Sequence, residues 1–185
     1  SRISEAAARA RRRADETPQR RRFGPRAVSP RLGPAAAPAA TEPDAMRRFP
    51  PDRIVCLTEE TVETLYLLGE ERRIVGVTGY AVRPERVRRE KPRVGAFTSA
   101  DVPKILALEP DLVLTFSDLQ ADIAAALIRE GVAVHAFNQR DIAGVLAMIR
   151  TLGALVGAAA KAEALAGDLA ARLTDARAEA AARGR

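Results

Sequence analysis

Short apolar runs of β type alternate with helical patterns from Arg53 onward, and this alternation restricts the possible folds more than any other feature. The runs lie roughly 20 residues apart with helical spacing between them, which is the pattern of βαβ units. Each run is nearly continuously apolar, as expected for parallel strands covered on both faces. They are "RIVCL" (53–57), "IVGV" (74–77), "RVGAF" (93–97), "DLVLTF" (111–116) and "VAVHAF" (132–137). The sequence therefore predicts an α/β fold, a Rossmann-like parallel sheet with helices on both faces.

The connections between the runs carry helical spacing, and an Ala-rich helical pattern follows them. The connections are "EETVETLYLLG", a short turn near "RPERVRRE", "DVPKILALE" and "LQADIAAALIREG". In the Ala-rich pattern Leu165, Leu169 and Leu173 form a narrow apolar stripe, which needs a surface to pack on. We expect residues 158–185 to be the start of one long helix, and the natural chain to continue past Arg185.

The positive charge is concentrated in the first 45 residues, which carry about +5 of the net +6 and leave residues 46–185 near +1. Nucleic-acid binding requires a basic face on the folded domain, so the charge balance argues against it. Residues 1–49 are rich in Arg, Ala and Pro, and we expect a disordered tail there. Met46 leaves two interpretations open: an over-extended reading frame, or a genuine linker or processed leader. Residues 50–157 hold the alternating pattern and are the expected ligand-binding domain.

Targeting signals are absent from the sequence pattern. The apolar stretches in the first 45 residues are too short for a secretory signal, and nothing approaches the length of a membrane span. These patterns predict a cytoplasmic protein without membrane insertion, or a periplasmic one if the start is mis-assigned. Cys56 is the single cysteine, so an internal disulfide is excluded.

Aromatic residues follow three of the predicted strands at their carboxyl ends, where open parallel sheets bind ligands. Tyr80, Phe97 and Phe116 occupy these positions, although aromatics make up only 4% of the chain. Polar residues accompany them: Thr78, Thr98, Ser99, Ser117 and Asp118. Flat rings on a polar rim suit a large, partly apolar ligand. The competing interpretation makes Phe97 and Phe116 ordinary core residues at strand ends.

Other chemically suggestive residues have structural interpretations. His135 is the only histidine and lies within an apolar run, and Cys56 is expected to be a small buried apolar residue. Glu59, Glu60 and Glu63 follow Thr58 in the first turns of a predicted helix, where carboxylates complement exposed amides.

The stretches "PPDRIVCLTEETVETLYLLGEERRIVGVTGY" and "ILALEPDLVLTF" resemble the solute-binding proteins for cobalamin and iron-siderophores that serve ABC importers. The resemblance covers about residues 50–185 and implies one lobe of a two-lobed, non-catalytic protein. It implies cobalamin or a ferric chelate as the ligand, with Tyr80, Phe97 and Phe116 at positions that contact the corrin in the cobalamin-binding members. It also implies an ABC permease as a partner.

Two departures from the family pattern bear on that partner. Pro103 stands where the family has a permease-docking glutamate, and Glu63 matches only a first-helix glutamate whose role is more simply structural. A signal peptide is also missing. Together these departures point to a cytoplasmic relative that binds a corrinoid or metal chelate without feeding a transporter.

Two other classes of function stay open from the sequence. A chelatase-like enzyme of tetrapyrrole chemistry would need a metal-holding pair in the cleft, for which Asp101, Asp118 and Asp141 are the strand-end candidates. A plain interaction module would instead use the Ala-rich helix and be indifferent to small ligands.

Overall fold

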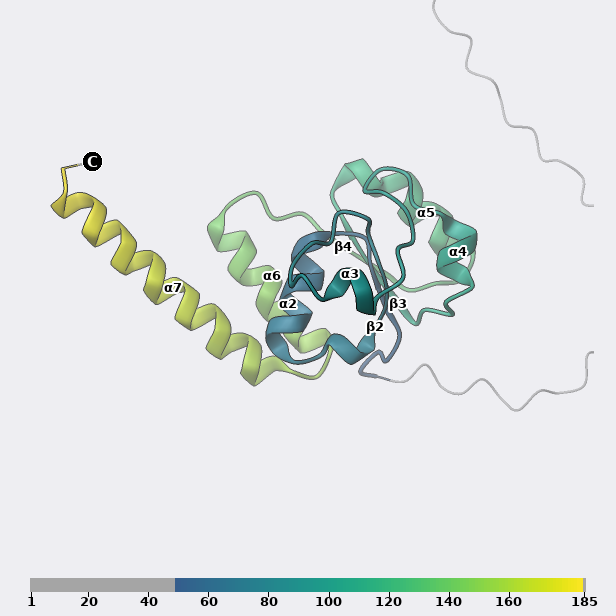
Figure 1. The fold of residues 1–185 in the computed structure, drawn as a ribbon, viewed down its shortest axis with the longest axis horizontal. Helices are drawn as coiled ribbons and strands as arrows, with labels where there is room; N and C mark the ends of the chain where they lie inside the picture. Colours follow the sequence, from purple (N-terminus) through teal and green to yellow (C-terminus); the bar gives the residue numbers. More distant parts are fainter. Residues whose placement is uncertain (1–48, 185) are drawn as a thin grey trace, which may run out of the picture. The chain divides into compact units, whose positions relative to one another are not determined.

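The computed structural model describes residues 49–184, whose centre is a four-stranded, fully parallel sheet (Figure 1). The strands lie in the order β2-β1-β3-β4. Their bounds are β1 Ile54–Cys56, β2 Ile74–Val77, β3 Leu112–Phe116 and β4 Val134–Phe137. All pairs are parallel, with Cys56 opposite Val77 on one side and Leu114 on the other. The predicted α/β class with a parallel sheet is confirmed, while the predicted tail lies almost entirely outside the described residues.

Helices connect the strands and cover both faces of the sheet (Figure 1). Helices α2, α6 and α7 pack on one face and α4 and α5 on the other. The bounds are α2 Glu59–Leu68, η1 Glu71–Arg73, α3 Val87–Glu90, α4 Val102–Leu106, η2 Asp118–Gln120, α5 Ala121–Arg129, α6 Ile142–Leu155 and α7 Ala159–Ala182. Within residues 49–184, no helix has the length and apolar character needed to cross a membrane.

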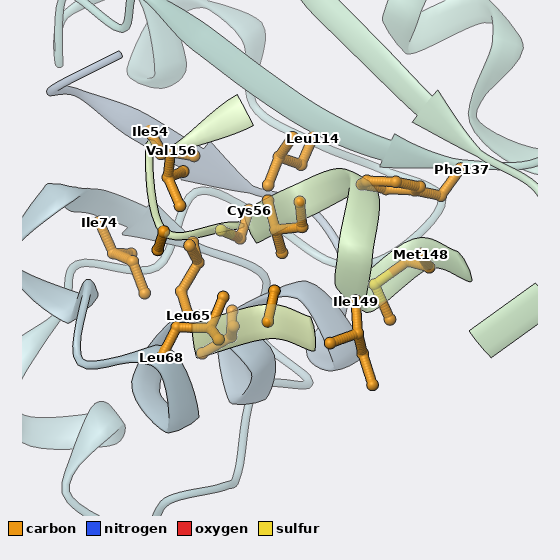
Figure 2. Packing of buried hydrophobic residues seen from close by; sticks show 14 of the residues in the cluster. Ile54, Cys56, Leu65, Leu68, Ile74, Leu114, Phe137, Met148, Ile149 and Val156 are labelled. Carbon is orange, nitrogen blue, oxygen red and sulfur yellow. The ribbon is translucent and has the colours of Figure 1, made fainter. Parts of the chain in front are cut away.

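Alternate strand residues point to opposite faces, so the sheet separates two apolar cores. Ile54, Cys56 and Leu114 belong to the core under α2 and α6, where Leu65 and Met148 also lie (Figure 2). Val55 and Val113 point the other way, toward Ile105 of α4 and Leu127 of α5. The continuously apolar runs in the sequence are explained by this double burial.

The run 93–97 is not a strand of the sheet, and this part of the sequence prediction is wrong. Only isolated bridges form there, Val77 with Arg93 in parallel and Gly95 with Ala100 in antiparallel sense. Gly95 has φ +124°, a backbone conformation that side chains disfavour and that no regular strand contains. The segment therefore turns away after Val94 and becomes a loop that carries Phe97.

Helices α6 and α7 form a hairpin that lies along α2. A Cβ at Gly153 of α6 would overlap Ala162 of α7, so the two backbones approach at a point that only glycine allows. Leu165 and Leu169 of the predicted stripe pack against the core. Further along, Leu169 and Leu173 line an apolar groove of about 450 Å³ with Ile142, Val145 and Leu146. The stripe thus has the packing surface that the sequence pattern required.

Candidate functional site

A hollow of about 410 Å³ lies at the edge of the sheet where the carboxyl ends of the strands meet. Because all four strands are parallel, the loops after them gather at this edge. The lining residues come from the start of α2, from the loop after β2 and from the loop that follows Gly95. They are Glu59, Glu60, Thr78, Tyr80, Phe97 and Thr98.

The three aromatic residues predicted from the sequence are brought to this edge in different environments. Tyr80 is 61% exposed, so its ring is not part of the core. Phe97 and Phe116 are half-buried, with ring centroids 6.4 Å apart and planes tilted by 49°. Phe116 also packs partly against the core beneath α2 and α6. The two phenylalanines thus form a contiguous aromatic pair beside the hollow, and Tyr80 stands free on its rim.

The predicted polar residues divide into two groups. Thr98 is exposed and lines the hollow, and the buried Thr78 accepts a hydrogen bond at Oγ1 from the Tyr80 N–H (3.4 Å). Ser117 and Asp118 follow Phe116 in the chain but do not line the hollow. Ser117 has φ +55° and its Oγ accepts a hydrogen bond from the Leu119 N–H (3.3 Å). Its role in the structure is therefore that of a turn residue that redirects the chain after β3.

Arg140 belongs to this edge and was missed by the sequence analysis. Its guanidinium carbon lies 5.4 Å from the centroid of the Phe116 ring, and Nη2 lies 3.6 Å from Oδ1 of Asp118. The guanidinium thus places a positive charge over an aromatic face at the rim. The sequence offered a signal for Arg140, because this residue comes soon after β4, and the three aromatics likewise lie at or just after the ends of their runs.

Gln120 was also missed, and it is 1% exposed beneath the same loops. Its Nε2 donates to the carbonyls of Leu57 (3.1 Å) and Phe97 (2.7 Å), while Oε1 accepts from the Phe116 N–H (2.9 Å). No sequence pattern marks a glutamine in a helical run as a link between three loops.

The acids weighed as metal-holding groups have other roles in the structure. Asp101 accepts from the Lys104 N–H (3.0 Å) and Asp141 from the Gly144 N–H (2.6 Å), so each caps a helix. Asp118 is the one that faces Arg140. Among residues 49–184, no group of three His, Cys, Asp or Glu side chains is placed to hold a metal ion.

His135 and Cys56 have the structural environments expected of them. His135 is half-buried on β4, its ring centroid 4.3 Å from that of Phe137, and desolvation lowers its pKa. Cys56 is fully buried, and burial raises the pKa of its thiol to about 12, so it stays protonated. A neutral thiol at this depth is a poor nucleophile.

The two positions that the family resemblance connects with permease docking lie on helices α2 and α4. Glu63 is half-buried on α2, with Oε2 3.4 Å from Nη2 of Arg83. Pro103 is exposed in the first turn of α4, where a missing N–H costs nothing because that turn has no acceptor for it. Glu63 is therefore engaged within the chain, and Pro103 is well suited to its helix.

The chain thus combines a parallel sheet with an aromatic hollow at its carboxyl edge, which is the usual place for a ligand in such a sheet. Comparison with known proteins identifies the class. A family model described as "Periplasmic binding protein" matches residues 54–185, and the chain belongs to this family. Members of the family bind solutes and are not catalysts, so the enzyme alternative is set aside.

Three known proteins illustrate the similarity. A cobalamin-binding protein of Halobacterium salinarum is 29% identical over 136 residues, which are 70% of this chain and 37% of that protein. The crystal structure of a periplasmic heme binding protein from Pseudomonas aeruginosa matches with a TM-score of 0.67 at 26% identity. The periplasmic vitamin B12 binding protein BtuF of Vibrio cholerae matches with a TM-score of 0.65 at 25% identity.

The matched region is one part of each known protein. Both crystal structures are matched over 71% of this chain, which corresponds to 48% of the heme binding protein and 52% of the vitamin B12 binding protein. The chain thus spans about half the length of these structures and less of the archaeal relative. The fold is accordingly that of one lobe of such a protein, with a long carboxyl-terminal helix, as the sequence predicted.

Proposed function

We propose that the carboxyl edge of this sheet forms one wall of a cleft that binds a corrinoid, in a solute-binding protein of the ABC-importer type. Haem and ferric siderophores are alternative ligands of the same broad kind, each a metal held in a large, partly apolar chelate. The observation that carries the proposal is that Tyr80 and Phe97 line one hollow at the sheet edge and that the Phe116 ring lies beside Phe97, with the two ring centroids 6.4 Å apart.

The geometry of the edge fits the flat face of a large ligand better than it fits a small polar ligand. The Phe97 and Phe116 rings are both half-buried and in contact with each other, and Phe116 also packs against the core, so a ligand can cover their exposed parts without reorganising the core. The hollow of about 410 Å³ is open and shallow, and its volume falls within the range of small-molecule sites. A corrin would extend beyond it, which is expected of one wall of a cleft.

The polar groups at the rim provide the orienting contacts that such a site needs. Thr98 offers a hydroxyl, and Arg140 offers a guanidinium that is held over Phe116 and can exchange Asp118 for an anionic group of the ligand. The descriptions of the relatives as cobalamin-, vitamin B12- and heme-binding proteins support a metal chelate as the ligand class.

Two observations bear on association with a permease, and they point in opposite directions. The solved relatives are described as periplasmic, which favours a location outside the cytoplasm, whereas the missing carboxylate at Pro103 favours a binding protein without a transporter. A Pro103→Glu variant would place a carboxylate in the first turn of α4, where the helix dipole stabilises it. Tight association of the unmodified chain with a corrinoid permease would show that the proline is no obstacle.

The ligand-binding proposal is tested by truncating the rings one at a time. Tyr80→Ala and Phe116→Ala should each weaken cyanocobalamin binding by about 1–3 kcal/mol, the scale of a lost buried aromatic contact, in a calorimetric titration. Phe49→Ala is the matched control, because Phe49 is 75% exposed but precedes β1 and lies outside the hollow. Equal affinity of all three variants and the wild type would remove the rings from the site.

A further inference from the structure

We propose that Gln120 is the positioning residue of this site: its side-chain amide sets the separation of the Phe97 and Phe116 rings. The consequence for ligand affinity rests on the proposed function, but the effect on the rings does not. Gln120 does not line the hollow, so it acts through the two phenylalanines and not by touching a ligand.

The argument begins with the backbone atoms that the amide contacts. Nε2 donates to the carbonyl of Phe97 at 2.7 Å, and Oε1 accepts from the N–H of Phe116 at 2.9 Å. One planar group thus holds the peptides of both aromatic residues. The second Nε2 hydrogen is directed to the carbonyl of Leu57 at 3.1 Å, which ties the pair to the end of β1.

The chemistry of the three partners requires an amide in this orientation. Two carbonyl oxygens need two donors and one N–H needs an acceptor, and a primary amide supplies this set from a single side chain. A carboxylate would face two carbonyl oxygens without a proton to offer. A thioether would leave both carbonyls without a donor and would be only a weak acceptor for the Phe116 N–H. Because Gln120 is 1% exposed, water has little access to replace a lost bond.

The loop that carries Phe97 needs such a tie because it is not a strand. Before Phe97, two hydrogen bonds join the loop to the edge of the sheet. The Val94 N–H donates to the Val77 carbonyl (3.0 Å), and the Gly95 carbonyl accepts from the Gly79 N–H (2.7 Å). Gln120 adds a bond at Phe97 itself, after the chain has turned at Gly95. The ring separation of 6.4 Å is therefore fixed by a contact between this loop and the turn after β3.

Holding the two rings in place before the ligand arrives lowers the ordering cost of binding. A ligand that meets preset rings gains contact with both at once. Without the amide, the loop is still closed at its base by the Asp101 N–H, which donates to the Val94 carbonyl (2.8 Å), but the Phe97 peptide loses its own tie. The ligand would then have to order that peptide, and affinity would fall even though both rings remain in the sequence.

Fluorine NMR on the full 185-residue chain, labelled with 4-fluorophenylalanine, tests the positioning role without a ligand. The Phe97 and Phe116 signals are assigned with Phe97→Leu and Phe116→Leu. In Gln120→Met we expect both signals to move and broaden. If Gln120→Met does not fold, Gln120→Asn gives the same readout, since its shorter amide cannot span all three partners.

Leu127→Ala is the matched control, because Leu127 is fully buried on α5, the helix that follows Gln120, but makes no hydrogen bond to the backbone of Phe97 or Phe116. It should lower stability and leave the two signals in place. Unchanged Phe97 and Phe116 signals in a folded Gln120 variant, or equal movement in Leu127→Ala, would overturn the proposal.

Cyanocobalamin titration of the same variants separates this inference from the proposed function. We expect Gln120→Met to raise the dissociation constant roughly tenfold while its rings move. Moved rings with unchanged cyanocobalamin affinity would count against the proposed site and leave the positioning role intact. Unmoved rings would refute the positioning role whatever the affinity.

Discussion

At the residue scale, Gly95 determines where the chain leaves the sheet and therefore where Phe97 lies. Its φ of +124° is unfavourable for any side chain, and a Cβ there would lie 2.6 Å from the Ser99 carbonyl oxygen and 2.8 Å from the Ala100 Cα. Both obstacles are backbone atoms, which cannot be moved by a change of rotamer. Gly95 is thus required by conformation and by space together.

Gly95→Ala should lower the free energy of unfolding by about 2–4 kcal/mol, because it adds a backbone clash to the conformational strain. Gly131→Ala is the control: its φ is +80°, but a Cβ there would meet nothing within 4 Å. It should cost only about 1–2 kcal/mol, the strain alone. Urea denaturation measures both, and equal losses would show that the space around Gly95 is not restrictive.

The thiol of Cys56 gives the protein a predictable response to alkaline pH. Its pKa is raised from 9.0 to about 12 by burial, so above pH 9 the unfolded chain loses a proton that the folded chain keeps. Stability must then fall with rising pH, and the contribution is fully present only below pH 9. Between pH 8 and pH 10 the wild type should lose about 1.4 kcal/mol more than Cys56→Ala.

Urea denaturation of the two proteins at both pH values checks the thiol response. The difference between them isolates Cys56, since the raised pKa of Tyr66 and the lowered pKa of Lys91 act in both. A constant difference from pH 8 to pH 10 would mean that the thiol ionises as readily in the folded chain.

At the scale of elements, the contact between α6 and α7 depends on the absence of one side chain. Gly153→Ala should cost about 1–3 kcal/mol, because its Cβ would overlap Ala162 of the facing helix and force the hairpin apart. Gly167→Ala is the matched change on α7, with nothing within 4 Å of its Cβ. It should instead stabilise the chain by about 0.5–1 kcal/mol through helix propensity.

Thermal unfolding monitored by circular dichroism separates the two glycine variants by the sign of the shift in melting temperature. Shifts in the same direction would contradict the close helix contact. The apolar groove next to this contact is a separate feature of the hairpin, and neither substitution lies among its lining residues.

The elements were predictable from the sequence wherever burial dictated their composition. Strands β1, β2 and β3 are mostly buried between two helical layers, so their apolar runs carried a clear signal, while the edge strand β4 is only partly covered and ends at the buried Phe137. The run 93–97 has similar composition, but the conformation of Gly95 is a backbone property that composition does not reveal. The ends of the second, third and fourth predicted runs identified the aromatic residues because the topology of a parallel sheet sends its loops to one edge.

The rest of the candidate site depends on contacts between segments far apart in the chain. Gln120 is bonded to Leu57 and Phe97, and Arg140 lies over Phe116. Such pairs are fixed by the order of strands in the sheet, with β3 between β1 and β4, and this order is not encoded in the local pattern. The site was therefore predicted in outline, and its supporting residues required the structure.

At the scale of the whole molecule, the chain matches about half the length of the solved relatives, so one lobe presents one wall of the proposed cleft. On this account one wall should bind the ligand more weakly than two walls together would. Mapping the residues that the ligand contacts is then a sharper test than measuring its affinity, because even a weakly bound ligand perturbs the residues that it contacts.

The most direct measurement is a map of amide chemical-shift changes in the ¹⁵N-labelled chain titrated with cyanocobalamin. The account predicts that the perturbed amides gather at the carboxyl edge, in Gly79, Tyr80, Phe97, Thr98 and Ser117. Perturbations centred on the groove between α6 and α7, or none up to the solubility limit of cyanocobalamin, would contradict the assignment of a corrinoid to the strand-end hollow.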